Sequence, residues 1–510
     1  MAAIGAVVAL FYAIFLFQGY TAFFRDSDTG WHIRTGEMIL RSASLPHFDP
    51  FSFTRAGQPW FAWEWLSDIL MGAVHQTAGL SGIVMLYGLA IAASVWLWFR
   101  LNWDVGGNFL LACVLASPML STCNIHWLAR PHVFSWIFFL VAVRYCERRS
   151  AGSNPLGLGA LAGVAGFTAL WTNMHASFFF APLIPLIWAL GTWLRGLLWE
   201  SESETGPVRE YLKIASVAAA ATLVNPYGWQ LHLHVARYLL DRDLLDRIGE
   251  FESFNFHADG ALPITLALAI AMAGAVLCLA RRRVEHFLLS ALLVVAALRS
   301  ARGLPLVALL ALPLANGAIT ESLAAAPGLT ARIRRSLDSF LHYGSRLRTL
   351  DARNNGFLTV ASACLLFAIL LKTPGISAVT GFPSDQFPVA AASTVAGLPP
   401  SAKVFAPDKF GGYLIYKFNG TRKVFFDGRS DFYGAGFLKD YGRIVQVRPG
   451  WQGLFDPYRF THALLPNNYS LIGVLKQQGW SQIYSDGTVT LLASANATSA
   501  NTRPDGLEKN

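Results

Sequence analysis

Long runs without charged residues alternate with short polar segments over residues 1–372. Residues 3–24 form the first run, 22 residues without a charge, and about 20 apolar residues suffice for a helix to cross a bilayer. Charge, proline or glycine bounds each later run, and each run predicts a further membrane-spanning helix. These predicted spans lie near residues 81–99, 107–122, 131–146, 157–173, 177–195, 212–225, 261–280, 285–299, 303–320 and 355–372. The pattern therefore predicts an α-helical polytopic membrane protein of about 11 spans.

The composition agrees with this interpretation. Charged residues make up 14% of the 510 residues and the mean hydropathy is +0.41, whereas about a quarter of the residues of a soluble protein are charged. The net charge of +9 arises in short loops between apolar runs, which indicates membrane topology and no nucleic-acid partner. An alternative for residues 3–24 is a cleaved signal peptide. The missing Lys or Arg flank and the length of the run favour a span.

Basic residues give the predicted orientation. With a cytoplasmic N-terminus, the three arginines at 281–283 and the basic segment 332–353 lie in inner loops, as the positive-inside rule requires. The first long loop, residues 25–80, and the chain after the last span then lie outside. Basic residues and leucines share the segment 332–350, which predicts an interfacial helix on the inner leaflet. The predicted location is the inner (plasma) membrane, multi-pass, with an extracytoplasmic C-terminal part.

The C-terminal part has a different pattern from the spans. Short strands are predicted at 404–405, 413–416, 424–426 and 489–492, turns at 411–412, 419–420 and 427–428, and a helix at 470–478. The chain thus divides into a transmembrane domain, 1–372, an α/β domain, 373–495, and a tail, 496–510, predicted to be disordered. We expect residues 380–495 to be soluble when produced alone. The five cysteines lie in or beside apolar runs, so no disulfide framework is indicated.

The first outer loop is dense in groups that do chemistry. Asp26 and Asp28 follow the first span, and His32 lies one helical turn after Asp28. Glu64 comes later in a run that holds three tryptophans. Carboxylates beside tryptophans at a membrane surface suit a lipid-borne substrate, for which a carboxylate serves as general base or metal ligand. The alternative is a solvated connecting loop with an interfacial tryptophan belt.

Further ionisable groups lie at predicted outer turns, on the same side of the membrane as Asp26 and Asp28. Such groups near apolar runs are costly and often functional, and seven of the outer set are expected to share one site: Asp28, Glu64, Arg130, His175, Glu252, Arg299 and Arg302. The arginines present the planar fork that phosphate oxygens fit, although a single arginine also reaches the interface without binding a ligand. The histidines lack a tight metal-ligand spacing such as HxxxH, so hydrogen-bonded turn residues are the alternative for them.

The phrases DSDTGWHIRTGE, RPH, WTNMHASF, NPYG and RSARGLP, on this layout, resemble the GT-C superfamily of membrane glycosyltransferases. Within it the chain is similar to bacterial members related to protein O-mannosyltransferases and aminoarabinose transferases. The resemblance implies transfer of a sugar from a polyprenyl-phosphate-linked donor to an acceptor glycan, lipid or protein on the outer face of the membrane. The usual Asp-Glu or Glu-Pro-Pro pattern is absent, which leaves the donor class and a divalent-metal requirement open.

The resemblance also implies roles for the charged residues. Asp28 is the expected base or metal-associated carboxylate, supported by Asp26 and Glu64. The donor phosphate is expected at Arg130, Arg299 and Arg302, and the candidate contacts to substrate or metal are His32, His175 and Glu252. No nucleotide cofactor is expected, since the sequence holds neither GxxxxGK[ST] nor GxGxxG. The competing functions are a transporter or flippase of lipid-linked saccharide and a non-catalytic membrane scaffold.

Overall fold

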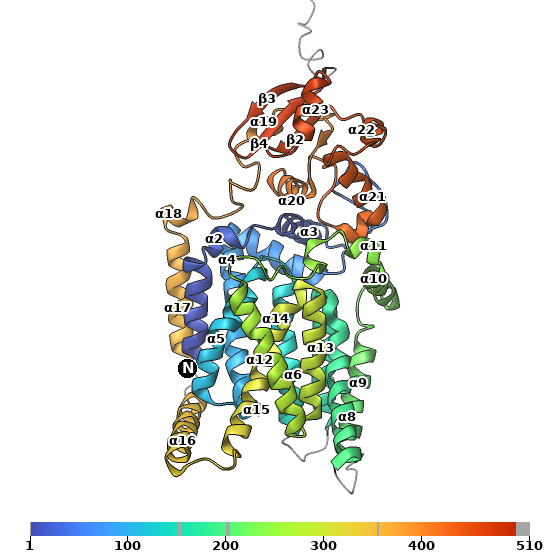
Figure 1. Ribbon diagram of the computed structural model, residues 1–510. Helices are drawn as coiled ribbons and strands as arrows, with labels where there is room; N and C mark the ends of the chain where they lie inside the picture. The colour runs from blue at the N-terminus through green and yellow to red at the C-terminus, as the bar shows by residue number, and fades with distance from the viewer. Residues whose placement is uncertain (1, 151–155, 200–204, 354–355, 496–510) are drawn as a thin grey trace, which may run out of the picture.

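The computed structural model describes residues 2–150, 156–199, 205–353 and 356–495 and has two stacked parts, a helical bundle and a smaller α/β domain at one end of it (Figure 1). The tail predicted at 496–510 lies outside the described residues. Every predicted span overlaps a helix of the bundle. These helices are α1 (Ala2–Phe11), α4 (Trp65–Asp104), α5 (Phe109–Cys123), α6 (His132–Ser150), α7 (Leu158–Met174), α8 (Phe180–Trp199), α9 (Thr205–Ala221), α12 (Ala261–Ala280), α13 (Val284–Arg299), α14 (Leu304–Leu306), α15 (Leu312–Ala324) and α17 (Phe357–Leu371).

Shorter elements connect these helices. Two π-helical segments extend the bundle helices, η1 (Tyr12–Leu16) and η6 (Val307–Ala311). Most of the others lie at the end of the bundle that carries the α/β domain, here called the domain side: α2 (Gly19–Ala22), α3 (Asp28–Ser42), η2 (Asn124–His126), η3 (Ala176–Phe179), α10 (Trp229–Leu240), α11 (Arg242–Leu245), η4 (Gly249–Phe251), η5 (Ala301–Gly303) and α18 (Pro374–Ser377). The segment predicted to form an interfacial helix is helical, α16 (Ala331–Arg353), and lies at the opposite end of the bundle (Figure 1).

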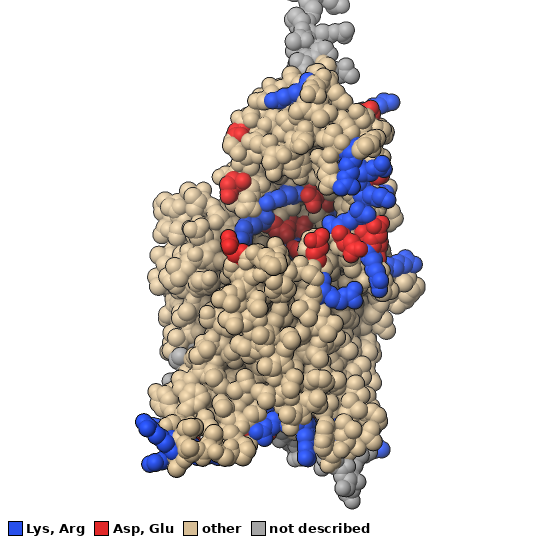
Figure 2. Space-filling model, in the orientation of Figure 1, with Lys and Arg blue, Asp and Glu red and all other residues tan. Residues whose placement is uncertain are grey.

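The bundle has the dimensions and surface of a membrane domain. In the described chain, five helical segments are long and apolar enough to cross a membrane: Trp65–Asp104, Phe109–His126, Ala176–Trp199, Ala261–Ala280 and Ala301–Ala324. Shorter apolar helices cover Ala2–Leu16, Leu158–Met174 and Leu358–Leu371. Figure 2 shows a broad uncharged belt across the visible face of the bundle and basic residues at the end away from the α/β domain. The chain is therefore a membrane protein, while the count of about 11 spans stays a prediction.

Helix α4 is interrupted at Gly79, which has non-helical φ/ψ angles of 61° and −156°. The polar residues 65–78 of the predicted outer loop therefore form a helical segment of their own, ahead of the predicted span at 81–99. These polar side chains face α3 and find partners there. The His32 Nδ1 lies 2.6 Å from Asp68 Oδ1, and the His75 Nδ1 lies 2.6 Å from Glu37 Oε1. In the sequence, polar side chains that pair two helices thus give the same pattern as the polar side chains of a solvated loop.

The α/β domain contains a four-stranded sheet of order β1-β2-β4-β3. Only β1 and β2 run parallel, and the remaining neighbours are antiparallel. The strands are β1 (Val404–Phe405), β2 (His462–Pro466), β3 (Ser481–Ser485) and β4 (Val489–Ala493). The helices are α19 (Ala392–Ala396), α20 (Asp408–Lys417), α21 (Ser430–Val445), α22 (Trp451–Phe455), η7 (Asp456–Tyr458) and α23 (Leu471–Gln477).

Several local predictions for this domain are confirmed and others are wrong. The strands at 404–405 and 489–492 and the helix at 470–478 are present. The segment 413–416 is part of helix α20 and is no strand, and the strands β2 and β3 were not predicted. At 424–426 the structure has only an isolated parallel bridge between Val424 and Ser52. That bridge ties the domain to the first outer loop.

Helix α20 packs against α3, so the α/β domain rests directly on the bundle. The predicted turn at 411–412 is wrong, because both glycines lie inside α20. A Cβ added to Gly412 would lie 2.4 Å from the Ser27 carbonyl oxygen, and one added to Gly30 would lie 2.2 Å from the Gly412 carbonyl oxygen. Backbone contact this close excludes any side chain. Phe410 and Tyr413 of α20 belong to the same buried core as Trp31 of α3.

Candidate active site

A cavity of about 610 Å³ lies between the domain side of the bundle and the α/β domain. Figure 2 shows this hollow with acidic and basic side chains gathered around it. Its ionisable lining comes from segments far apart in the sequence: Arg25, Asp26, Asp28, His32, Glu64, His126, Arg130, His132, His175, Glu250, Arg302, Asp408, Lys409, Arg429 and Asp431. The cavity walls also include apolar residues of α6, α10 and η3. A site with these walls can hold a ligand that is charged at one end and apolar at the other.

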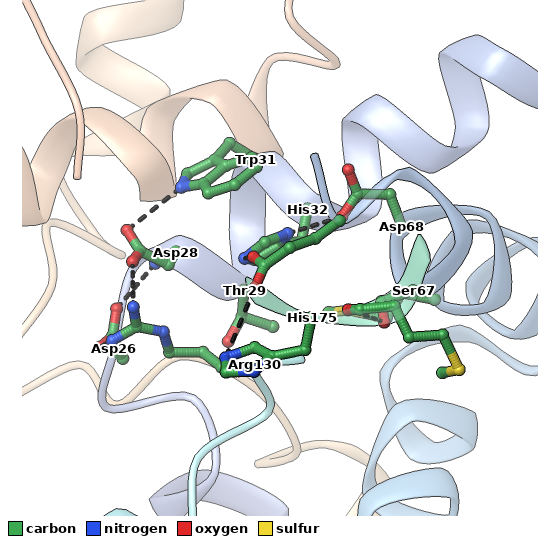
Figure 3. Close-up of polar contacts among 12 residues, drawn as sticks. Asp26, Asp28, Thr29, Trp31, His32, Ser67, Asp68, Arg130 and His175 are labelled. Atoms are coloured by element: carbon green, nitrogen blue, oxygen red, sulfur yellow. Dashed lines mark hydrogen bonds and ion pairs between the residues drawn. The ribbon is translucent and has the colours of Figure 1, made fainter. Parts of the chain in front are cut away.

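Arg130 lies between three carboxylates. Its Nη1 is 2.7 Å from Asp26 Oδ2 and 2.8 Å from Glu250 Oε1, and its Nη2 is 2.9 Å from Asp28 Oδ2. Figure 3 shows Asp26 and Asp28 converging on the guanidinium. Glu250 also accepts a hydrogen bond of 2.7 Å from Arg302 Nε. The cluster therefore joins three acids and two arginines through charge-assisted hydrogen bonds, which are stronger than neutral ones.

Local backbone contacts hold this cluster in place. Asp26 Oδ1 accepts a 2.8 Å hydrogen bond from the backbone N–H of Asp28 at the start of α3, where helix N–H groups favour a negative charge. The Arg130 segment is tied to α3, because Thr29 Oγ1 donates to the Ala129 carbonyl at 3.0 Å. On the other wall, Ser300 Oγ donates to the Glu250 carbonyl at 3.0 Å. These hydrogen bonds fix the backbone segments that carry the charged side chains.

A second buried cluster lies beside the first. His32 Nε2 is 3.7 Å from Glu64 Oε2, and Glu64 Oε1 is 3.5 Å from His175 Nε2. Asp68, at the start of α4, forms a hydrogen bond with the Nδ1 atom of His32. Trp31 connects the two clusters, since its ring centroid lies 3.6 Å from that of His32 and its Nε1 donates to Asp28 Oδ1 at 3.1 Å. The view in Figure 3 includes His175, Asp68 and Trp31.

Burial shifts the protonation of these groups. Burial and the Asp26 charge raise the pKa of Asp28 to about 7, against the opposing effects of Arg130 and Trp31. Burial raises the pKa of Glu64 to about 8, and burial together with the Arg302 charge lowers the pKa of His175 to about 3. Burial opposes ionisation of Glu250, but the Arg130 and Arg302 charges outweigh it and hold its pKa below the usual range. Near neutral pH, Asp28 is therefore poised between its two forms.

The α/β domain forms the roof of the site. A Cβ added to Gly428 would lie 1.9 Å from Asp28 Oδ1, so the loop before α21 touches the acid directly. The next residue, Arg429, is 2% exposed and binds Asp427 at 2.7 Å and Asp49 at 2.7 Å. Its guanidinium also lies 4.6 Å from the Trp60 ring centroid. The roof is therefore locked to the first outer loop by a buried cation, and it excludes water from one side of Asp28.

The structure brings most of the residues singled out in the sequence to this cavity. Asp26, Asp28, His32, Glu64, Arg130, His175 and Arg302 all line it. Two do not: Arg299 is exposed at the end of α13, and the Glu252 side chain is exposed and outside the cavity. Glu250, two residues earlier, is the acid in this position. The expectation that Glu252 contacts a ligand in this site is therefore corrected to Glu250.

Several cavity residues were missed in the sequence. Arg25 lies in the predicted outer loop but was not singled out, and Gly428 was predicted only as part of a turn. Lys409, Arg429 and Asp431 lie in the α/β domain, which was predicted to lie outside the membrane but for which no contact with the site was predicted. The run Asp-Gly-Arg-Ser-Asp at 427–431 was the available signal, because it sets three charged residues around a glycine next to an apolar strand-like segment.

A divalent metal does not fit between the three carboxylates, because the Arg130 guanidinium occupies that position and supplies the positive charge. Among the described residues, no group of three or more His, Cys, Asp and Glu side chains is arranged to hold a metal ion.

No family model and no curated protein matches the chain. Solved structures of the oligosaccharyltransferase of Archaeoglobus fulgidus do match its fold, with a TM-score of 0.57 and 11% sequence identity over 91% of this chain and 69% of the archaeal chain. One is the apo form, and another is AglB in complex with an inhibitory peptide and a dolichol-phosphate. A third is tethered to an acceptor peptide containing the NVT sequon, with the same identity and score over 68% of that chain. The chain therefore has the GT-C fold that the sequence motifs suggested.

Proposed function

We propose that this protein is a glycosyltransferase that moves a sugar from a polyprenyl-phosphate-linked donor to an acceptor hydroxyl or amide on the outer face of the membrane. The observation that carries the proposal is the buried Asp28, held by Arg130 beside Asp26 in a cavity at one end of a GT-C bundle. Two archaeal structures of this fold hold a dolichol-phosphate or an acceptor peptide, which supports a lipid-linked donor. The acceptor remains a glycan, a lipid or a protein.

In the proposed reaction Asp28 acts as the general base. Its carboxylate accepts the acceptor proton while the acceptor atom attacks the anomeric carbon of the donor sugar from the side opposite the phosphate. The new bond forms as the bond between the anomeric carbon and the phosphate oxygen breaks, and the electron pair leaves with the lipid phosphate. The anomeric configuration is therefore inverted. The lipid-linked donor supplies the energy, so no nucleotide takes part.

The other charged residues support this step. Arg130 forms ion pairs with Asp26 and Asp28, and its charge favours the ionised form of Asp28. Glu64, with a pKa of about 8, is mostly protonated near neutral pH and can donate a hydrogen bond to a sugar or acceptor oxygen. His32 and His175 are neutral there and offer ring nitrogens to the same wall of the cavity. These groups orient the substrates, and Asp28 moves the proton.

Two other functions explain less of the structure. A transporter or flippase needs polar groups along a path through the bilayer centre, whereas the ion pairs around Arg130 gather at one end of the bundle. A scaffold has no need of an acid with a shifted pKa in a cavity of about 610 Å³. The orientation in the membrane follows from the basic residues at the opposite end of the bundle, which favour a cytoplasmic location for that end.

The test uses full-length protein in proteoliposomes with a panel of hexosyl and pentosyl polyprenyl phosphates carrying labelled sugars. Release of polyprenyl phosphate and labelling of an envelope extract report transfer. We expect Asp28→Asn to lower the rate about 10²-fold or more at little cost in folding, because the amide keeps the size and polarity of the acid but cannot accept the proton. Arg299→Gln is the matched control, since Arg299 lies outside the cavity. Wild-type transfer by Asp28→Asn would rule out this base.

A further inference from the structure

The two cavity arginines expected to bind the donor phosphate already bind carboxylates. Arg130 contacts three acids, and Arg302 forms an ion pair with Glu250 while its guanidinium lies 4.3 Å from the Phe251 ring centroid. A phosphate arriving at either arginine would have to displace a carboxylate from a charge-assisted hydrogen bond. A phosphate site is therefore better sought at cations of the same cavity that hold no carboxylate.

Arg25 and Lys409 are such cations. Arg25 donates from Nε to the Ala22 carbonyl at 3.0 Å, and its guanidinium lies 5.1 Å from the Phe17 ring centroid. Lys409 donates from Nζ to Gln386 Oε1 at 3.0 Å. Within the described part of the chain, neither forms a salt bridge, and most of their N–H donors remain available. Both line the cavity that holds Asp28.

Arg25 also borders a second cavity of about 420 Å³, which shares Arg25 and Asp26 with the first. Its remaining lining is Phe17, Asn124, Ile125 and Leu128. Phe17 directly follows η1, and Ile125 lies in η2 at the end of the candidate span Phe109–His126. These residues therefore lie where two membrane helices reach the domain side, which is the depth of lipid headgroups. Arg25 thus stands between a groove that holds three apolar side chains and the charged cavity.

We propose that Arg25 and Lys409 bind the phosphate of a polyprenyl phosphate, and that the groove formed by Phe17, Ile125 and Leu128 holds the isoprenoid units next to it. The guanidinium offers a planar fork to phosphate oxygens, and the ammonium adds a point charge. Arg130 and the Asp28 backbone N–H both bind the Asp26 carboxylate, which weakens its repulsion of a phosphate at this position. The inference rests on the proposed function in one respect: if the protein transfers a sugar, the phosphate bound here is the leaving group and lies beside the acid cluster.

The test is lipid binding, measured by native mass spectrometry on full-length protein in nanodiscs. The probes are a polyprenyl monophosphate, the matching uncharged polyprenol and inorganic phosphate. We expect Arg25→Gln and Lys409→Gln each to weaken polyprenyl phosphate binding roughly tenfold, the effect of losing one hydrogen bond to a charged group. Arg25→Lys should lose less, and Arg299→Gln should bind as the wild type does. Polyprenol should bind weakly, and millimolar inorganic phosphate should not displace the lipid.

Each contrary result overturns the site. If Arg25→Gln and Lys409→Gln melt and bind as the wild type does, these residues do not hold the phosphate. Equal binding of polyprenol would remove the phosphate from recognition, and displacement by inorganic phosphate would assign the site to a soluble anion. Failure of the proposed function looks different: the wild type then binds polyprenyl phosphate through Arg25 but transfers no sugar from any donor. Conversely, if Arg25→Gln transfers sugar with an unchanged donor KM, the proposed function stands and the proposed phosphate site is wrong.

Discussion

Replacing Arg130 by glutamine removes the only positive charge that contacts both Asp26 and Asp28 among the described residues, and leaves three carboxylates around an amide. Breaking a fully buried ion pair costs about 3–5 kcal/mol, and an exposed pair is worth about 0–1 kcal/mol. The Arg130 side chain is 16% exposed, and the Asp26 and Glu250 side chains are 22% and 27% exposed. We therefore expect a loss of about 2–3 kcal/mol in the free energy of unfolding, between those limits.

The measurement is thermal unfolding of purified full-length protein in one detergent. In a chain of this size 1 kcal/mol corresponds to about 2 °C or less, so Arg130→Gln should lower the melting temperature by about 3–5 °C at pH 8. Arg299→Gln removes the same charge from an exposed position outside the cavity and should melt within about 1 °C of the wild type.

The loss should also depend on pH. The Arg130 charge lowers the pKa of Asp28 and holds down that of Glu250, so both rise in the variant. Above the unfolded-state values of about 4, the native variant then binds more protons than the native wild type. The stability gap must therefore grow as pH rises and shrink as it falls, with a smaller gap at pH 5.5 than at pH 8. A variant that matches the wild type at both pH values would refute the reading of Arg130 as the counter-charge of the three acids.

Three further predictions test other parts of the site. Gly428→Ala places a Cβ 1.9 Å from Asp28 Oδ1 and should lower transfer at least tenfold, whereas Gly436→Ala, which meets nothing within 4 Å, should not; equal rates would mean that the roof can shift freely. Wild-type stability should fall as pH rises from about 5 toward the Glu64 pKa of about 8, because the native state holds the proton that the unfolded state releases. Glu64→Gln should make that slope shallower in melting curves, with Asp28 and its pKa of about 7 contributing to what is left, and an unchanged slope would mean that Glu64 does not hold the proton. The isolated segment 380–495, expected from its sequence to be soluble alone, should expose the α20 face that packs on the bundle and bind a hydrophobic dye; a soluble fragment that binds no dye would contradict this.

The bundle and the neighbourhood of Asp28 could be predicted because both follow from coarse properties of the sequence. Uncharged runs define the helices, and the positive-inside pattern puts the short polar turns on one side, where Asp28 and Arg130 then meet at 2.9 Å. A charge left alone at this depth is costly, so grouping with opposite charges was expected.

The choice between neighbouring acids could not be made in the same way. Glu250 and Glu252 are two residues apart in GEFESF, and both follow the same apolar helix. Glu250 lies inside a short 3-10 turn, Gly249–Phe251, and from there its side chain reaches Arg130. Glu252 follows the turn, and its carbonyl accepts a hydrogen bond of 2.9 Å from the Ala301 N–H. Which acid the turn presents to Arg130 depends on contacts with a segment about fifty residues away. The local sequence pattern contains no information on these contacts.

The glycines of α20 have the largest consequence for chemistry, although the sequence presents them as a turn. Because Gly412 and Gly30 allow the backbones of α20 and α3 to touch, the α/β domain sits low enough for Gly428 to reach Asp28. That contact removes water from the carboxylate, and burial is the largest cause of its pKa of about 7. Without the roof, Asp28 would face solvent beside Arg130, and the same guanidinium would favour the fully ionised acid, a weaker base. The domain therefore does more than cover the site, since its position sets the basicity on which the proposed transfer depends.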